Sequence, residues 1–151
     1  MTGHRTTDYG YFLPITTRWM DNDVYGHVNN VTYYSYFDTV ANHYLIREGG
    51  LDIQTSPVIA LVVESKCSYR APVAYPDALR AGLRVDKLGN RSVTYGIGIF
   101  ADDPADPDIP GEAVAHGHFV HVFVDREQRT AVPIPEPLRA ALATLVTEDT
   151  R

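Results

Sequence analysis

The chain has 151 residues, a length that is typical of one domain and that can bury a core without disulfides or a structural metal. Its content of 44 % hydrophobic and 21 % charged residues is that of a globular protein and excludes a disordered chain. With 13 Lys and Arg against 19 Asp and Glu, the net charge of −6 argues against a broad basic face that binds nucleic acid.

The single cysteine, Cys67, cannot form an internal disulfide, which indicates a reducing compartment. It lies in an alternating, strand-like run, so we expect it to pack as a small side chain and not to act as a nucleophile. The first residues lack the hydrophobic segment of a signal peptide, and no run approaches the length of a membrane span. We therefore expect a cytoplasmic protein that does not associate with membranes, with residues 1–8 and 147–151 frayed.

The first predicted strand and the long helix follow in chain order. Alternating apolar residues predict a strand over Tyr11–Thr17, and Pro14 places it at a sheet edge because proline lacks a backbone donor. Apolar residues at helical spacing predict a helix over Val31–Arg47 in spite of its poor helix propensity. Asn30 is expected to cap this helix, and the glycine pair at 49–50 to end it. Because the helix is apolar on most sides, we expect it to be buried on most sides.

The rest of the chain is predicted to form consecutive strands and one short helix. Alternation of apolar and polar residues predicts strands over Pro57–Arg70, Leu79–Asp86, Ser92–Ile99 and Glu112–Asp125. Between the last two strands, the acidic, proline-rich segment 102–111 is expected to be an exposed loop, and Pro137 opens a short amphipathic helix. Consecutive strands imply an antiparallel sheet of the α+β class, and wrapping that sheet around the long helix would enclose it. Since no repeat or linker is present, residues 1–151 form one predicted domain.

The segment from Arg18 to Asn30, with the sequence RWMDNDVYGHVNN, carries the chemical groups and lies directly before the predicted helix. A helix start offers unpaired backbone N–H groups that can stabilise the oxyanion formed when a carbonyl is attacked. A nearby carboxylate can make that attack or activate water, and Gly26 would allow the loop to turn sharply enough to bring both together. The segment therefore indicates acyl transfer or hydrolysis, although an Asx-rich loop that only caps a helix is the alternative.

The pattern D-x-D-x-x-G-H-V-N-N-x-x-Y resembles the signature of the 4-hydroxybenzoyl-CoA thioesterase-like hotdog proteins. The resemblance extends to the segments 63–72, 88–92 and 131–135, and so covers roughly Tyr11 to Leu138. It implies a five-stranded antiparallel sheet wrapped around the long central helix, to which the periodicity adds a short C-terminal helix. It also implies homodimers or homotetramers with sites at the subunit interface. The implied activity is that of an acyl-CoA thioesterase, which uses no cofactor beyond the coenzyme A of its substrate.

The resemblance assigns roles residue by residue. Asp23 matches the catalytic carboxylate, as nucleophile or general base, and the thioester carbonyl would point at backbone N–H groups around Asn30. His27 matches a position that is not histidine in every member and would help to position the substrate. Asp21 is expected to be structural. The residues expected to bind substrate are Gly26, Asn29, Tyr33, Glu64, Arg91 and Arg129.

Several of these assignments have alternatives. Some hotdog thioesterases place the catalytic carboxylate on the central helix, so Asp38 or Glu64 could face the site across a dimer, or could be solvated acids. Arg91 and Arg129 are expected near the phosphates of coenzyme A, with Lys66 and Arg70 as further candidates, although each could be a plain surface charge.

Three other interpretations of the function remain open: a metal site, a non-catalytic subunit and a thioesterase for a different carrier. On a strand, His116 and His118 share a face with the spacing of some zinc or copper sites, but no third ligand is evident and packed histidines explain the run equally well. A non-catalytic hotdog subunit that binds a ligand or assembles is the alternative to an enzyme. An acyl-carrier-protein thioesterase would change the carrier and leave the chemistry unchanged.

Overall fold

The computed structural model describes residues 3–101 and 111–147. Its strands are β1 (Tyr11–Thr16), β2 (Val58–Tyr69), β3 (Ala78–Leu88), β4 (Ser92–Ala101) and β5 (Ala115–Asp125). Its α-helices are α1 (Thr32–Arg47) and α2 (Glu136–Ala143), and short 3₁₀ turns cover η1 (Thr6–Asp8) and η2 (Trp19–Asp21). The predicted elements are all present, with ends that differ by at most a few residues.

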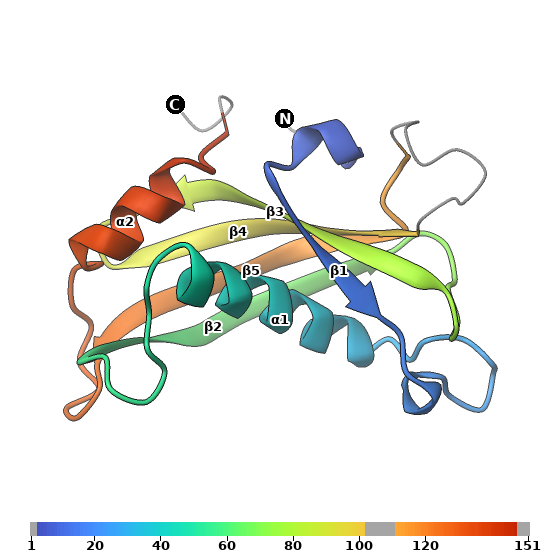
Figure 1. The fold of residues 1–151 in the computed structure, drawn as a ribbon, viewed down its shortest axis with the longest axis horizontal. Helices are drawn as coiled ribbons and strands as arrows, with labels where there is room; N and C mark the ends of the chain where they lie inside the picture. Colours follow the sequence, from blue (N-terminus) through green and yellow to red (C-terminus); the bar gives the residue numbers. More distant parts are fainter. Residues whose placement is uncertain (1–2, 102–110, 148–151) are drawn as a thin grey trace.

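The five strands form one antiparallel sheet in the order β1-β3-β4-β5-β2. Figure 1 shows the long helix α1 lying across one face of this curved sheet, with α2 beside the ends of β3 and β4. The hotdog fold of the α+β class is therefore confirmed. Pro14 lies on the edge strand β1, where its missing N–H costs no ladder hydrogen bond, as the sequence predicted.

The core lies between α1 and the sheet. Alternate residues of the central strands face the helix, because successive side chains of a strand point to opposite sides. The buried strand residues on this face include Leu79, Ala81, Leu83 and Val85 of β3, Val93, Tyr95, Ile97 and Ile99 of β4, and Ala115, Phe119 and Phe123 of β5. The two-residue periodicity that predicted these strands is thus the periodicity of the core.

The long helix is less enclosed than its composition suggested. Seven of its side chains are buried, but a stripe that includes Ser35, Asp38 and Thr39 is exposed, so within one chain the prediction of burial on most sides was wrong. The prediction that Asn30 caps the helix was also wrong. The start of α1 has no side-chain cap, and the Asn29 side-chain oxygen instead accepts a hydrogen bond from the Val31 N–H at 2.9 Å in the turn just before the helix. The helix ends at the glycine pair as predicted, and Gly50 has a φ of +74°.

The N-terminal segment packs on the outer face of the sheet. Its residues 3–8 are therefore not frayed, and this part of the prediction was wrong. The His4 ring stacks on the His116 ring with a centroid distance of 3.5 Å, and the Arg84 guanidinium donates to the Gly3 carbonyl at 2.7 Å. Arg84 also lies 4.6 Å from the centre of the Tyr9 ring. These contacts hold the segment against the sheet. Thr147, also expected to be frayed, donates its N–H to the Val85 carbonyl at 3.2 Å. Of the other residues in these predictions, 1–2, 148–151 and 102–110 of the acidic loop lie outside the described residues.

Among the described residues, no helix is both long and apolar enough to cross a membrane.

Candidate active site

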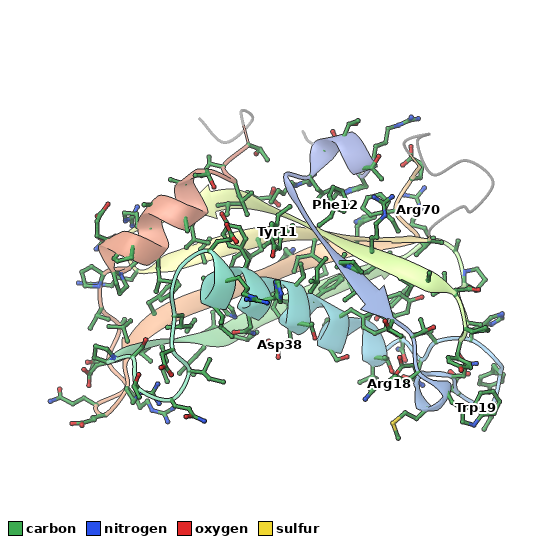
Figure 2. The ribbon with its side chains drawn as sticks, viewed as in Figure 1. Tyr11, Phe12, Arg18, Trp19, Asp38 and Arg70 are labelled. Atoms are coloured by element: carbon green, nitrogen blue, oxygen red, sulfur yellow. The ribbon has the colours of Figure 1, made fainter. Side chains whose placement is uncertain are left out.

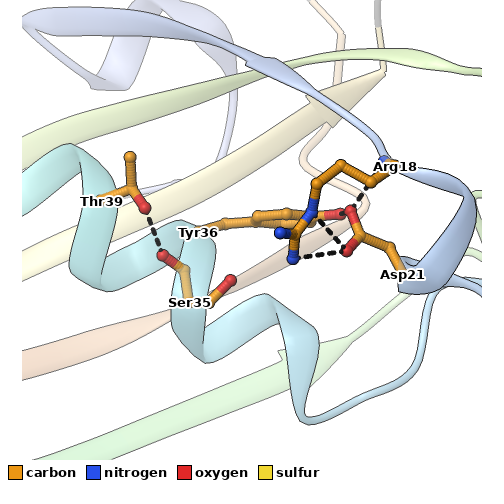
Figure 3. A network of polar contacts seen from close by, with 5 residues as sticks. All are labelled: Arg18, Asp21, Ser35, Tyr36 and Thr39. Carbon is orange, nitrogen blue, oxygen red and sulfur yellow. Dashed lines mark hydrogen bonds and ion pairs between the residues drawn. The ribbon is translucent and has the colours of Figure 1, made fainter.

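The loop before α1 is anchored by a buried carboxylate. Asp21 is only 1 % exposed, and it accepts hydrogen bonds from the Arg18 N–H at 2.9 Å, the Arg18 guanidinium at 3.1 Å and the Tyr36 hydroxyl at 2.8 Å (Figure 3). Burial alone would raise the pKa of Asp21, but these hydrogen bonds together lower the pKa below its usual value. Asp21 therefore stays ionised and ties the loop to the helix, the structural role that the sequence suggested.

Asp23 follows in a tight turn that orients its carboxylate. One carboxylate oxygen, Oδ1, accepts the Tyr25 N–H at 2.9 Å, and the other, Oδ2, accepts the Asn29 side-chain amide at 3.3 Å. The Gly26 N–H donates to the Asp23 carbonyl at 3.0 Å, and Gly26 has a φ of +84°, in the region that favours glycine. The sharp turn that was predicted for Gly26 is therefore confirmed.

The helix start presents a backbone donor beside this carboxylate. The carbonyl of Asn29 accepts the Thr32 N–H at 2.9 Å, which directs it into the helix. Because a trans peptide points its N–H opposite its C=O, the Asn30 N–H of the same peptide points outward from the helix start. Within residues 3–101 and 111–147, no group accepts a hydrogen bond from the Asn30 N–H. A carbonyl oxygen could therefore bind there.

A pocket of about 400 Å³ collects these groups. Its lining residues are Asp23, His27, Val28, Asn30, Tyr33, Tyr69, Arg70, Ala71 and Pro72. The structure thus brings together the three residues predicted to be catalytic, Asp23, His27 and Asn30, with the predicted pocket residue Tyr33. Gly26 and Asn29 lie on the other side of Asp23, where they line a neighbouring hollow of about 710 Å³ with Trp19 and Tyr25.

Comparison with known proteins identifies the family. Residues 17–142 match the Thioesterase-like superfamily. The chain belongs to this superfamily. Its structure is similar to the crystal structure of the PA5185 protein of Pseudomonas aeruginosa strain PAO1, with 53 % identity, a TM-score of 0.90, and coverage of 96 % of this chain and 97 % of that one. It is 26 % identical over 126 residues to the uncharacterized protein YsmA of Bacillus subtilis strain 168, covering 83 % of this chain and 80 % of that protein.

A third likeness shows the fold alone. The 1,4-dihydroxy-2-naphthoyl-CoA thioesterase Slr0204 from Synechocystis is 17 % identical with a TM-score of 0.76, covering 89 % of this chain and 96 % of that one. Membership in the Thioesterase-like superfamily supports thioester hydrolysis as the general activity of the chain.

Three residues predicted from the superfamily resemblance do not reach the pocket within one chain. Glu64 lies on the outer face of the sheet, where its carboxylate pairs with His118 at 2.7 Å. Arg91 lies in the β3–β4 turn and Arg129 in the loop after β5. Both are near the Val58–Asp125 end of the β2–β5 ladder, whereas the pocket lies at its Tyr69–Ala115 end.

Of the other acids and cations considered, only Arg70 lines the pocket. Asp38, labelled in Figure 2, is exposed and bonded to the Asn42 amide at 2.9 Å, and it does not line the pocket. Lys66 pairs in register with His118 on the outer face. Arg70 follows directly after β2, so it reaches the pocket because the strand ends there.

Tyr69, the last residue of β2, was not singled out from the sequence. Its hydroxyl donates to the Asn30 carbonyl at 2.9 Å, and its ring packs edge-on against Tyr33 with a centroid distance of 5.2 Å. Alternation in the strand placed Tyr69 on the apolar face. Only the pairing of the strands shows that this end of β2 meets the start of α1.

The remaining candidate chemistries have structural explanations. Burial raises the pKa of the Cys67 thiol to about 11, so this thiol is protonated near neutral pH and is a poor nucleophile. His116 and His118 share the outer face as predicted, but the first stacks on His4 and the second pairs with Glu64. In the part of the chain that the structure describes, no three His, Cys, Asp or Glu side chains are grouped so that they could hold a metal ion.

Proposed function

We propose that this protein hydrolyses acyl-CoA thioesters in the pocket between the Asp23 loop and the start of α1. The observation that carries the proposal is that Asp23 and Asn30 line the same pocket, with the Asn30 N–H pointing outward from the helix start. Hydrolysis of a thioester needs a nucleophile on one side of the carbonyl and a donor for the oxygen that becomes negative. Membership in the Thioesterase-like superfamily supports the same general chemistry.

The proposed reaction uses a backbone donor, a carboxylate and a water molecule. The thioester carbonyl oxygen accepts a hydrogen bond from the Asn30 N–H, which stabilises the negative charge that forms on attack. The Asp23 carboxylate either takes a proton from the attacking water or attacks the carbonyl carbon itself to form a mixed anhydride that water then opens. In both cases the C–S bond breaks, the thiolate of coenzyme A leaves and takes up a proton, and the acyl group departs as the free acid. His27, whose backbone carbonyl accepts the Asp23 N–H at 3.0 Å, would position the substrate at the pocket wall.

The carrier that we propose is coenzyme A. Arg70 places a permanent positive charge at the pocket, and the phosphates of coenzyme A are the part of the substrate that a guanidinium binds best. Arg91 and Arg129 would reach the same pocket only from a second chain. An acyl-carrier-protein thioester is the competing substrate, and it carries a single phosphate next to the pantetheine arm.

The acyl group would contact aromatic rings. Tyr33 and Tyr69 line the pocket edge-to-face, and planar acyl groups pack well on such rings. The Synechocystis protein of the same fold is named for an aromatic acyl-CoA substrate. Substrate panels should therefore include benzoyl-type as well as aliphatic thioesters.

We infer that a second copy of the chain completes the functional unit. β2 is the last strand of the sheet, so among residues 3–101 and 111–147 one side of its backbone has no strand beside it. Val62 and Val63 on this strand are 45 % and 60 % exposed. The loop that carries Asp23 exposes further apolar side chains, with Trp19 at 77 % and Tyr25 at 84 %. Monomeric proteins rarely expose so much apolar surface around a site, which favours a homodimer or a homotetramer.

The test is release of free thiol from a panel of acyl-CoA and acyl-carrier-protein thioesters. The wild-type protein is expected to hydrolyse at least one acyl-CoA, and Asp23→Asn is expected to lower kcat by at least about 100-fold. Asp38→Asn is measured beside it, because Asp38 is the exposed acid of α1 that could instead reach a site from a second chain, and it is expected to keep kcat. Absence of turnover with every thioester, or full activity in Asp23→Asn, would contradict the proposal. Turnover of acyl-carrier-protein thioesters alone would show that the carrier is acyl carrier protein and not coenzyme A.

A further inference from the structure

The end of strand β2 reaches across to the start of α1 through one side chain. Tyr69 donates its hydroxyl proton to the carbonyl of Asn30 at 2.9 Å, a contact between residues 39 positions apart in the sequence. Burial raises the pKa of this hydroxyl, so it keeps its proton and remains a donor over the pH range in which proteins are stable. Tyr69 also lines the pocket and is the last residue of β2, the strand at the edge of the sheet.

The peptide groups around the Asn30 N–H are fixed on both sides. The peptide that joins Asn29 to Asn30 is held by its carbonyl, which accepts the Thr32 N–H. The next peptide, between Asn30 and Val31, is held at its N–H by the Asn29 side chain and at its carbonyl by the Tyr69 hydroxyl. Of these four polar groups, three have partners and the Asn30 N–H alone has none among the residues that the structure describes.

We propose that Tyr69 is a positioning residue for this reaction, because its hydroxyl holds the Asn30 peptide and so fixes the direction in which the Asn30 N–H meets the thioester oxygen. This inference rests on the proposed function. A helix start without tertiary contacts frays, and a frayed first turn would let the donor swing away from the carbonyl. Catalysis by a preorganised donor depends on its being held before the charge develops.

The ring of Tyr69, whose hydroxyl bonds to the Asn30 carbonyl, is supported by a neighbouring ring. Tyr69 is itself 45 % exposed, but its ring lies edge-on to Tyr33, which is only 3 % exposed, so a buried ring supports the one that presents the hydroxyl. Removing only the hydroxyl would therefore leave the pocket wall in place and release the Asn30 carbonyl. Removal of the hydroxyl alone therefore tests the positioning of the Asn30 N–H separately from the binding of the acyl group.

The test compares Tyr69→Phe with Tyr11→Phe. Tyr11 also carries a hydroxyl bonded to α1, to His43 at 2.8 Å, but at a site remote from the pocket. For Tyr69→Phe we expect kcat to fall by about tenfold with KM changed by less than about twofold. The pH profile of kcat should keep its shape, since no titrating group is lost. Tyr11→Phe should keep kcat, while both variants lose a similar amount of thermal stability.

Backbone amide NMR provides a readout that does not depend on turnover. In Tyr69→Phe the Asn30 and Val31 amide resonances are expected to shift and to exchange faster with solvent, and in Tyr11→Phe they should not move. Unchanged kcat, or unchanged Asn30 and Val31 resonances, would overturn the inference. A shifted limb in the pH profile would overturn it too, because the hydroxyl would then act on the substrate directly. If wild-type protein hydrolyses no thioester, the proposed function fails, whereas the amide spectra still show whether Tyr69 holds Asn30.

Discussion

The side-chain amide of Asn29 donates to the Asp23 carboxylate at 3.3 Å, while its oxygen accepts the Val31 N–H at 2.9 Å. One side chain therefore links the proposed nucleophile or base to the start of the helix that presents the proposed oxyanion donor. The backbone of Asn29 is itself held by Asp21, whose carbonyl accepts the Asn29 N–H at 2.9 Å. The two halves of the site are thus kept at a fixed separation by a residue that is not expected to touch the reacting atoms.

Asn29→Ala should lower kcat by about 10- to 100-fold, because it frees both the carboxylate and the first turn of the helix. Asn42→Ala is the matched control, since Asn42 makes the same kind of side-chain bond to Asp38, at 2.9 Å, on the exposed side of α1. Steady-state kinetics of the two variants check the prediction. Equal activity in both would show that the Asn29 bridge has no part in the reaction.

Arg70→Ala should raise KM for acyl-CoA by about fivefold, the effect of losing roughly 1 kcal/mol of charge attraction at a solvent-accessible site. KM for the corresponding acyl-pantetheine, which lacks the nucleotide phosphates, should not change. Arg91→Ala and Arg129→Ala are assayed in parallel. If these two variants raise KM while Arg70→Ala does not, the phosphate-binding cations come from a second chain and the assignment of Arg70 is wrong.

Gly26→Ala and Gly50→Ala should each destabilise the fold by about 1 kcal/mol, because both glycines have positive φ. A methyl group at either position would meet nothing within 4 Å, so the cost is one of backbone conformation and not of packing. Only Gly26→Ala should also lower kcat, since Gly26 turns the loop that aims Asp23, whereas Gly50 ends the helix far from the pocket. Thermal unfolding and turnover are measured on both. An unchanged kcat in Gly26→Ala would show that the turn at Gly26 does not affect catalysis.

Stability should fall as the pH drops from about 6.5 to about 4 because His121 is buried as the neutral ring. Its side chain is 1 % exposed, the ring nitrogen Nδ1 lies 3.0 Å from the Tyr95 hydroxyl, and burial lowers its pKa to about 4. Since its folded pKa lies below the unfolded value of 6.5, the unfolded chain binds more protons in this window, and folding loses on the order of 3 kcal/mol by pH 4.

The control for this prediction is His121→Gln, which keeps an acceptor for the Tyr95 hydroxyl and cannot titrate near neutral pH. Urea unfolding of both proteins at pH 7 and pH 4.5 gives the comparison. The wild type should lose more free energy of unfolding between the two pH values than the variant does. Equal losses would show that the His121 ring is protonated in the folded state.

The fold could be predicted because its signals are local. The alternation in β3 and β4, the helical spacing of Phe37 and Val40, and the glycines after α1 each constrain a short stretch, and the sheet follows from their order. The resemblance to a family signature assigned Asp23, His27 and Asn30, and that signature is also local, since the three residues lie within one loop and helix start.

The rest of the site could not be predicted because it depends on strand register. β2 has 12 residues, so its two ends lie far apart, and alternation gives the face of Glu64 or Tyr69 but not the end of the sheet that each one meets. Arg91 and Arg129 matched a family pattern in sequence, yet the ladders place them away from the pocket of their own chain. Which of the two asparagines bonds to the Val31 N–H depended on the geometry of the loop, because Asn29 and Asn30 have the same capping propensity.

In the proposed reaction, the Asn30 N–H and the Asp23 carboxylate act on one carbonyl. The most direct test is to titrate ¹⁵N-labelled protein with an acyl-CoA ketone in which a methylene group replaces the thioester sulfur. If they do, the Asn30 amide proton shifts downfield with saturation, and to a different extent in Asp23→Asn. If the resonances of the pocket residues His27 and Tyr33 shift while the Asn30 resonance stays in place, the carbonyl does not bind at the helix start and the proposed reaction is contradicted.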